Sequence, residues 1–241
     1  MKIWSAPTPN GWKVAIMIEE LRERGLVLDD LEVTTVDLRA GEQFSAAFTA
    51  VNPNQKIPAL QDGDITLMES CAILQYLAEK YPSALLPEGA ARWQVLQWLY
   101  WQAANLGPVF GNKLSYTRYL GDVDASLRAH PLERFGSEAQ RLLRVFDKQL
   151  QGRDYICGDD LTIADIACFP WIRGWKWSKI DITSHARVVD WLERLRNHAG
   201  VKRGVAYGAP TGEAEQWSED TKKRYVSMGA GIASNDNIKA S

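Results

Sequence analysis

The residues best suited to chemistry lie near the start of the chain, where Thr8, Asn10 and Gly11 follow the short segment Ile3–Ser5. We expect a strand to end and a helix to begin at this point. Such a junction offers unpaired backbone N–H groups and the positive end of a helix dipole, which stabilise a thiolate or another anion. The turn holds a threonine and an asparagine but no cysteine or tyrosine. Any thiol used here must therefore come from a bound cofactor.

Pro58 stands at the start of a segment that otherwise has the pattern of a strand. Proline normally interrupts a sheet, so two solutions fit: a trans proline at a sheet edge, or a cis Ile57–Pro58 bond. We predict the cis bond. The backbone N–H and C=O of Ile57 would then pair with an extended peptide as a neighbouring strand does.

Glu69 and Ser70 stand directly before an amphipathic helical pattern. A serine at a helix N-terminus usually caps the helix. The same hydroxyl and its backbone N–H could also hold a ligand carboxylate while Glu69 accepts an ammonium group. The two roles are compatible, so both stay open.

The segment Thr162-Ile163-Ala164-Asp165 has the spacing of a capping box, with a hydroxyl at the N-cap and a carboxylate three residues later. An apolar run follows it. We therefore predict that Asp165 is buried and structural rather than catalytic.

The elements that must position these residues fall into two groups. Over residues 1–81 the strand patterns cover 3–5, 31–38, 57–61 and 65–67, and the helix patterns cover 10–24, 43–50 and 70–81. A parallel βαβ half followed by an antiparallel hairpin predicts a thioredoxin-like α/β domain.

Prolines at both ends mark residues 82–87 as a linker. Strand patterns are scarce beyond it, and helices are expected over 90–106, 131–151, 162–175 and 186–198. This predicts an all-α C-terminal helical bundle over 88–208. Residues 209–241 are polar and small, and we expect a tail that covers the surface or is partly disordered.

The composition argues against several classes of protein. The 241 residues carry a net charge of −2, which gives no basic surface for nucleic acid, and no apolar run approaches the ~20 residues that span a membrane. The three cysteines are too widely spaced for a disulfide framework or a metal site, and the three histidines have no ligand spacing. We expect packing roles for the cysteines, no metal and a cytoplasmic location.

Three segments, Asn52–Leu60, Glu69–Leu77 and Leu161–Ala167, together resemble the cytosolic glutathione transferase superfamily in their order and spacing. The resemblance covers roughly residues 1–205. Residues 6–11 and 96–102, with Gly107-Pro108, are similar to the bacterial Nu-class enzymes, which use glutathione for disulfide reduction. The Tyr, Ser or Cys usual at the thiol position of the family is replaced by the Thr8/Asn10 pair.

The resemblance implies the glutathione transferase fold, with glutathione as cosubstrate and a homodimer as the working unit. It implies that the glutathione sulfur lies near Thr8 and Asn10 and that its backbone pairs with Ile57. It places the γ-glutamyl end at Glu69 and Ser70. The remaining contacts that it implies are Gln43, Asn54 and Lys56 near the glycyl carboxylate, and Gln102 and Arg134 across a dimer interface.

Three functions stay open from the sequence. The Thr8/Asn10 pair favours a glutathione-dependent disulfide-bond reductase. A transferase that conjugates or cleaves an aromatic electrophile would need a deep apolar pocket between the tryptophan-rich helices. A non-catalytic glutathione-binding regulator would keep the fold and the site without turnover, because a fold alone does not fix a function.

Overall fold

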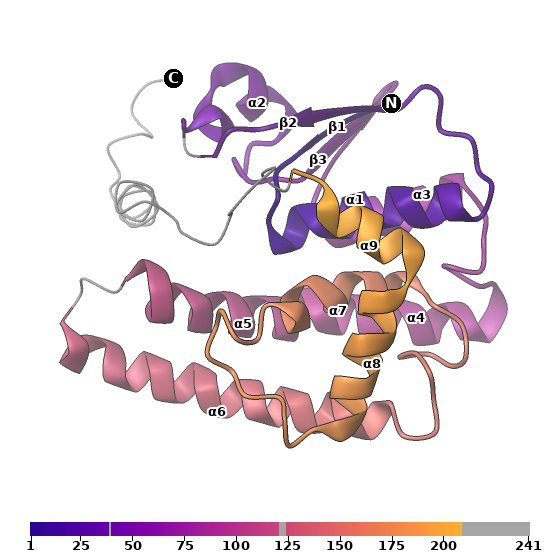
Figure 1. The fold of residues 1–241 in the computed structure, drawn as a ribbon. Helices are drawn as coiled ribbons and strands as arrows, with labels where there is room; N and C mark the ends of the chain where they lie inside the picture. The colour runs from indigo at the N-terminus through magenta and orange to yellow at the C-terminus, as the bar shows by residue number, and fades with distance from the viewer. Residues whose placement is uncertain (39, 121–123, 209–241) are drawn as a thin grey trace.

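A four-stranded sheet organises the N-terminal part of the chain in the computed structural model, which describes residues 1–38, 40–120 and 124–208 (Figure 1). The strand order is β2-β1-β3-β4, with β1 parallel to β2 and antiparallel to β3, and β3 antiparallel to β4. The strands are β1 (Lys2–Ser5), β2 (Glu32–Thr35), β3 (Ala59–Asp62) and β4 (Ile65–Met68).

Helices cover both faces of this sheet. α2 lies on one face, and α1 and α3 lie on the other, between the sheet and the remaining helices (Figure 1). The bounds are α1 (Pro9–Glu23), the 3₁₀ turn η1 (Glu42–Phe44), α2 (Ala46–Val51) and α3 (Ser70–Lys80). This arrangement confirms the predicted thioredoxin-like fold.

From residue 89 onward the described chain is helical apart from its connections. The elements are α4 (Gly89–Trp101), the π-helical turn η2 (Gln102–Leu106), α5 (Gly107–Leu114), the π-helical turn η3 (Ser115–Tyr119), α6 (Ala125–Gln149), α7 (Ile163–Arg173), α8 (Ala186–Asn197) and α9 (Ala199–Ala206). The all-α C-terminal part is thus confirmed. The division into domains joined at residues 82–87 stays a prediction, and the predicted tail over 209–241 lies outside the described residues.

Several helix boundaries differ from those expected. The helix expected over 90–106 ends its α-helical part at Trp101 and continues through η2 and Pro108 into α5. The helix expected to begin at Pro131 begins at Ala125, where Asp124 caps it through a 2.7 Å bond from the Ser126 N–H. Pro131 therefore lies inside α6, where it removes one hydrogen bond of the helix and crowds the carbonyl four residues earlier, but does not end the helix.

α9 was not expected, because two glycines interrupt its helical pattern. Both glycines allow α9 to pack closely against α1. A Cβ on Gly204 would lie only 2.5 Å from Cα of Ile16, and one on Gly200 would lie 2.3 Å from Oε1 of Glu20. Close helix packing therefore explains these glycines, which local propensity alone would assign to a loop.

Tryptophan side chains form much of the core between the helices. The rings of Trp98 and Trp191 contact Phe146 edge-on, with centroids 6.1 and 4.9 Å away, and Trp101 stacks on the same ring. Because Trp98 and Trp191 are buried, their role is packing. Among the described residues we find no helix whose length and hydropathy suit it to span a bilayer.

Asp165 lies at the centre of a buried hydrogen-bond network, as predicted. Its Oδ2 accepts from the Thr162 N–H at 3.0 Å and from the Thr162 hydroxyl at 2.9 Å. Its Oδ1 accepts from the Ile156 N–H and from the Trp191 indole N–H, both at 2.9 Å. Burial raises the pKa of Asp165, and these four donors act in the opposite direction. One side chain thereby ties the start of α7 to α8 and to the preceding loop.

Replacing Asp165 with alanine should lower the stability of the protein without changing the residues around the sheet. Buried donors left without acceptors cost at least about 3 kcal/mol together, so the Tm of Asp165→Ala should fall by roughly 6–12 °C. Thermal unfolding checks this, with the exposed Asp160→Ala as a matched control that stays near the wild-type Tm. A stable Asp165→Ala protein that no longer binds glutathione would contradict the structural role.

Candidate functional site

The register of the sheet brings four chain segments to one edge. Ser5 at the end of β1 lies beside Thr35 at the end of β2. Ala59 at the start of β3 lies between Trp4 and Met68, near the ends of β1 and β4. Three strands therefore leave the sheet at the edge where β3 enters it. The predicted site residues next to these strand ends are Thr8 and Asn10 after β1, Gln43 after β2, Ile57 before β3, and Glu69 and Ser70 after β4.

The turn after β1 has the geometry expected of an anion-binding helix start. Thr8 is the N-cap of α1, and its Oγ1 accepts the N–H of Gly11 at 3.3 Å. Pro9 has no N–H, and the Trp12 N–H donates to the Thr8 carbonyl at 2.8 Å. Among the described residues neither the Asn10 N–H nor the Thr8 hydroxyl donates a hydrogen bond, so both donors are open to a ligand in this turn.

The segment before β3 is shaped by Asn52, which is buried. Its Nδ2 donates to the Lys56 carbonyl at 2.5 Å, and its Oδ1 accepts the Asn54 N–H at 2.9 Å. The predicted cis Ile57–Pro58 bond is confirmed. The Ile57 backbone has no hydrogen-bond partner within the described chain.

The other predicted residues near this edge differ in exposure. The side chains of Asn54 and Lys56 are exposed, whereas Gln43 in η1 is buried. Glu69 is exposed and has a φ of 72°, which is rare for a residue other than glycine, and such conformations concentrate at functional sites. Ser70 follows as the first residue of α3 and is only 6% exposed.

A buried lysine, which the sequence analysis missed, connects this edge to the helical part. Lys13 in α1 is 2% exposed, and its Nζ lies 3.1 Å from Ser70 Oγ and 2.6 Å from Gln102 Oε1. Gln102 itself is fully buried and also accepts from the Cys71 thiol at 3.3 Å. Gln102 therefore lies inside its own chain rather than at an exposed surface that could form a dimer interface. One signal was present in the sequence: Lys13 shares a helix face with the apolar Met17.

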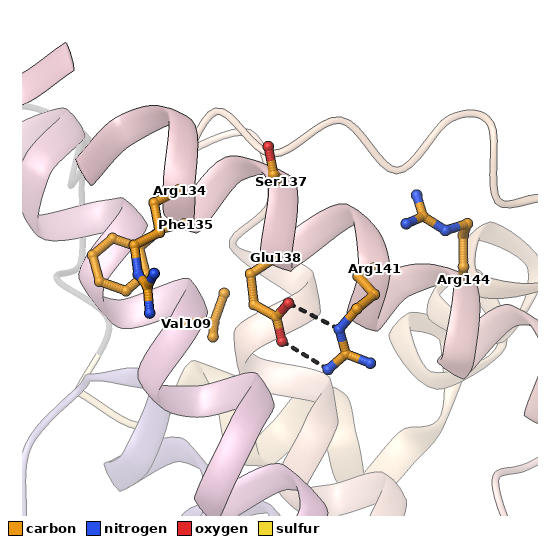
Figure 2. Close-up of a pocket in the computed structure, with 7 residues that line it drawn as sticks. All are labelled: Val109, Arg134, Phe135, Ser137, Glu138, Arg141 and Arg144. Carbon is orange, nitrogen blue, oxygen red and sulfur yellow. Dashed lines mark hydrogen bonds and ion pairs between the residues drawn. The ribbon is translucent and has the colours of Figure 1, made fainter. Parts of the chain in front are cut away.

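Arg134 lies apart from the sheet edge, on α6. Together with Val109 of α5 it lines an open hollow of about 640 Å³, whose other lining residues are Phe135, Ser137, Glu138, Arg141 and Arg144 (Figure 2). Figure 2 shows Glu138 paired with Arg141, at 2.7 Å. Arg134 is exposed and forms no ion pair with the described residues.

The three cysteines are free thiols, and two of them ionise less readily than an ordinary cysteine. Burial raises the pKa of Cys157 to about 12 and that of Cys168 well above its ordinary value. Cys71 and Cys168 are buried. Within the described residues, no group of three or more His, Cys, Asp or Glu side chains could hold a metal ion.

Two models of one protein family match different parts of this chain. Residues 1–79 match the N-terminal domain of Glutathione S-transferase, and residues 134–199 match its C-terminal domain. Disulfide-bond oxidoreductase YfcG of Escherichia coli is 37% identical over 202 residues, which cover 81% of this chain and 89% of the relative. This chain belongs to the glutathione transferase family. The predicted family, fold and type of enzyme are confirmed, and glutathione is the cosubstrate of that enzyme type.

One further relative and two solved structures are similar over most of the chain. Disulfide-bond oxidoreductase YghU of Escherichia coli is 36% identical over 215 residues, covering 85% of this chain and 73% of the relative. A Pseudomonas fluorescens family member crystallised with two glutathione bound is 40% identical, with a TM-score of 0.77 over 85% of this chain and 91% of that one. A Pseudomonas putida glutathione transferase with one glutathione disulfide bound per subunit is 36% identical, with a TM-score of 0.76 over 85% of this chain and 90% of that one.

The glutathione transferase turn after β1 leaves no room for a side chain at Gly11. A Cβ there would lie 1.9 Å from the Ala6 carbonyl oxygen and 2.7 Å from Ser5 Oγ. Gly11→Ala should therefore cost at least about 1–3 kcal/mol of unfolding free energy, measured by denaturant titration. Gly174→Ala is the matched control, because its Cβ would meet nothing closer than 3.5 Å. Equal stability of the two variants would show that the turn is not constrained in this way.

Proposed function

We propose that this protein is a glutathione-dependent disulfide-bond reductase, with the thiolate of bound glutathione stabilised by Thr8 and Asn10. The observation that supports it best is the Thr8 cap, whose oxygen accepts the Gly11 N–H at 3.3 Å and so leaves its hydrogen for a sulfur. The names of the YfcG and YghU relatives support the same chemistry. The raised pKa of Cys157, to about 12, argues against a protein thiolate.

The energetic demand on these residues is modest. A free thiol has a pKa near ~8.5, and each unit by which it is lowered is worth ~1.4 kcal/mol. A hydroxyl, an amide and the N–H groups at a helix start can supply about one to two units together. That is enough for a substantial thiolate fraction at neutral pH.

The proposed reaction is two successive thiol–disulfide exchanges. The glutathione thiolate attacks one sulfur of the substrate disulfide, so that an S–S bond forms to glutathione and the other substrate sulfur leaves as a thiolate, which takes up a proton. A second glutathione thiolate then attacks the glutathione sulfur of this mixed disulfide. The products are glutathione disulfide and two substrate thiols, so the electrons and protons come from two glutathione molecules.

The rest of the tripeptide is assigned to the same edge of the sheet. We place its cysteinyl backbone against the Ile57 N–H and C=O, which have no partner in the described chain. We place the γ-glutamyl end at Glu69 and Ser70. The exposed ammonium of Lys56 suits the glycyl carboxylate, with Asn54 and Gln43 beside it. Because the cysteines are free thiols, we also propose a cytoplasmic location.

Asn10→Ala tests the role of the turn. Alanine is a good helix former, so the variant should fold, and it keeps the backbone N–H. Losing the Asn10 side-chain amide as a donor to the sulfur should lower disulfide-reductase kcat by at least about tenfold. The assay is glutathione-dependent reduction of a small disulfide, run beside conjugation of a chloronitroaromatic to test the transferase alternative. Cys157→Ser is the control and should keep most of the activity; unchanged kcat in a folded Asn10→Ala protein would exclude the proposed role.

We further propose that the working unit is a homodimer in which Arg134 reaches the partner subunit's glutathione. Large apolar side chains are exposed on α4 and β4, where Trp93 is 69% exposed, Tyr100 59%, and Ile65 and Met68 44% each. A twofold dimer would bury such side chains on both subunits. Arg134 has no ion pair among the described residues and offers a guanidinium that suits a carboxylate.

Arg134→Ala should raise the KM for glutathione by about tenfold or more without lowering the Tm, because an exposed side chain is removed. Arg144→Ala is the matched control: it is exposed, lies on the same helix and lines the same hollow. Light scattering should give the mass of two 27.1 kDa chains. A fully active monomer would refute both the dimer and the cross-subunit role.

A further inference from the structure

Lys13 is a buried cation surrounded by neutral partners. Its side chain is among the largest that are fully buried, and its Nζ contacts Gln102 Oε1 at 2.6 Å, Ser70 Oγ at 3.1 Å and Cys71 Sγ at 3.8 Å. No carboxylate forms an ion pair with it among the described residues. Burial lowers its pKa, while Cys71, Cys168 and Glu69 act in the opposite direction. A buried ammonium without a counter-charge is costly, so its place beside Ser70 needs an explanation.

We propose that Lys13 is a positioning residue for the γ-glutamyl carboxylate of glutathione, acting through Ser70. This inference rests on the glutathione orientation proposed above. A lysine ammonium donates hydrogen bonds and accepts none, so the Ser70 oxygen is the acceptor in their 3.1 Å contact. The single hydroxyl hydrogen of Ser70 is then directed away from Lys13 and is available to a carboxylate. A flexible hydroxyl is thereby set as a donor before the ligand arrives.

Charge supports the same assignment. Glu69 is exposed directly beside Ser70 and would repel the α-carboxylate of a γ-glutamyl group while attracting its ammonium. A positive charge behind Ser70 offsets that repulsion. The bound carboxylate in turn supplies the counter-charge that Lys13 lacks in the described chain. Each charge thereby lowers the free energy of burying the other in a site of low dielectric constant.

Gln102 completes this arrangement from the helical part of the chain. Its Oε1 accepts from Lys13 Nζ at 2.6 Å and thus holds the amine as a second acceptor beside Ser70. Because Gln102 is fully buried, its contribution to glutathione binding is indirect, through Lys13. The chain of contacts from Gln102 to Lys13 to Ser70 joins η2, α1 and α3 at the site.

The experiment compares two ligands in two variants. One ligand is glutathione, and the other is 4-aminobutyryl-cysteinyl-glycine, which is glutathione without the α-carboxylate of the γ-glutamyl group. Dissociation constants are measured by calorimetry for the wild type and for Lys13→Met, which keeps the side-chain length but removes the charge. Lys113→Met is the control, because that partly buried lysine lies on α5 and donates to the Leu132 carbonyl on α6.

Lys13→Met should weaken glutathione binding by about tenfold, or ~1.4 kcal/mol, and leave binding of the analogue within about twofold. Lys113→Met should change neither. If Lys13→Met does not fold, Lys13→Gln replaces it and should weaken glutathione selectively in the same way. A purely structural lysine would weaken both ligands equally, and that result, or no weakening at all, overturns the inference while leaving the proposed reductase intact.

The wild type separates the remaining outcomes. Wild-type protein that binds the analogue as tightly as glutathione would show that Ser70 does not hold the carboxylate, and both the orientation and the role of Lys13 would fall. Wild-type protein that binds neither ligand would refute the proposed function itself. Selective loss in Lys13→Met, absent in Lys113→Met, supports the inference.

Discussion

The pairing of β1 with both of its neighbours is the constraint on which the rest of the structure depends. β1 runs parallel to β2 and antiparallel to β3, and β3 runs antiparallel to β4. Three strand ends and one strand start therefore meet at one edge. Because side chains alternate along a strand, a slip of one residue would turn the buried Ile3 and Leu60 outward as well as move the turns that follow. The same apolar burial that fixes the register thus fixes the distance between the Thr8 turn and Ser70, the two ends of the proposed glutathione site.

α1 carries this constraint from the sheet into the helices. Thr8 caps its first turn, and Lys13 contacts Ser70 and Gln102. Ile16 packs against α9 at Gly204, where the absence of a side chain allows the two helices to approach closely. A shift of α1 along its axis would disturb both the Thr8 turn and the packing of the helices. Mutations at the α1–α9 contact should therefore lower the stability of the protein and displace α1 at the proposed site, because a close-packed core transmits small displacements.

Local patterns predicted the elements whose identity depends on near neighbours in sequence. The capping box at Asp165 and the hairpin between β3 and β4 needed only a few consecutive residues. Lys13 could not be predicted in this way, because its partners Ser70 and Gln102 lie 57 and 89 residues away. A lysine also suggests an exposed position, and its burial follows from tertiary contacts alone. The same holds for the two glycines of α9, whose role is evident only when α1 lies against them, with Glu20 at Gly200 and Ile16 at Gly204.

The distribution of thiols and hydroxyls explains why a diffusible thiol suits this scaffold. Two of the three protein thiols, Cys157 and Cys168, occupy places where burial opposes ionisation. The groups proposed to stabilise a thiolate lie instead at the Thr8 turn, where the chain has no sulfur of its own. A reactive cysteine fixed in that turn would oxidise with the enzyme, whereas in the proposed reaction the tripeptide leaves as its disulfide and is replaced. Under that proposal the protein contributes orientation and electrostatics, and the redox state stays with the exchanged cosubstrate.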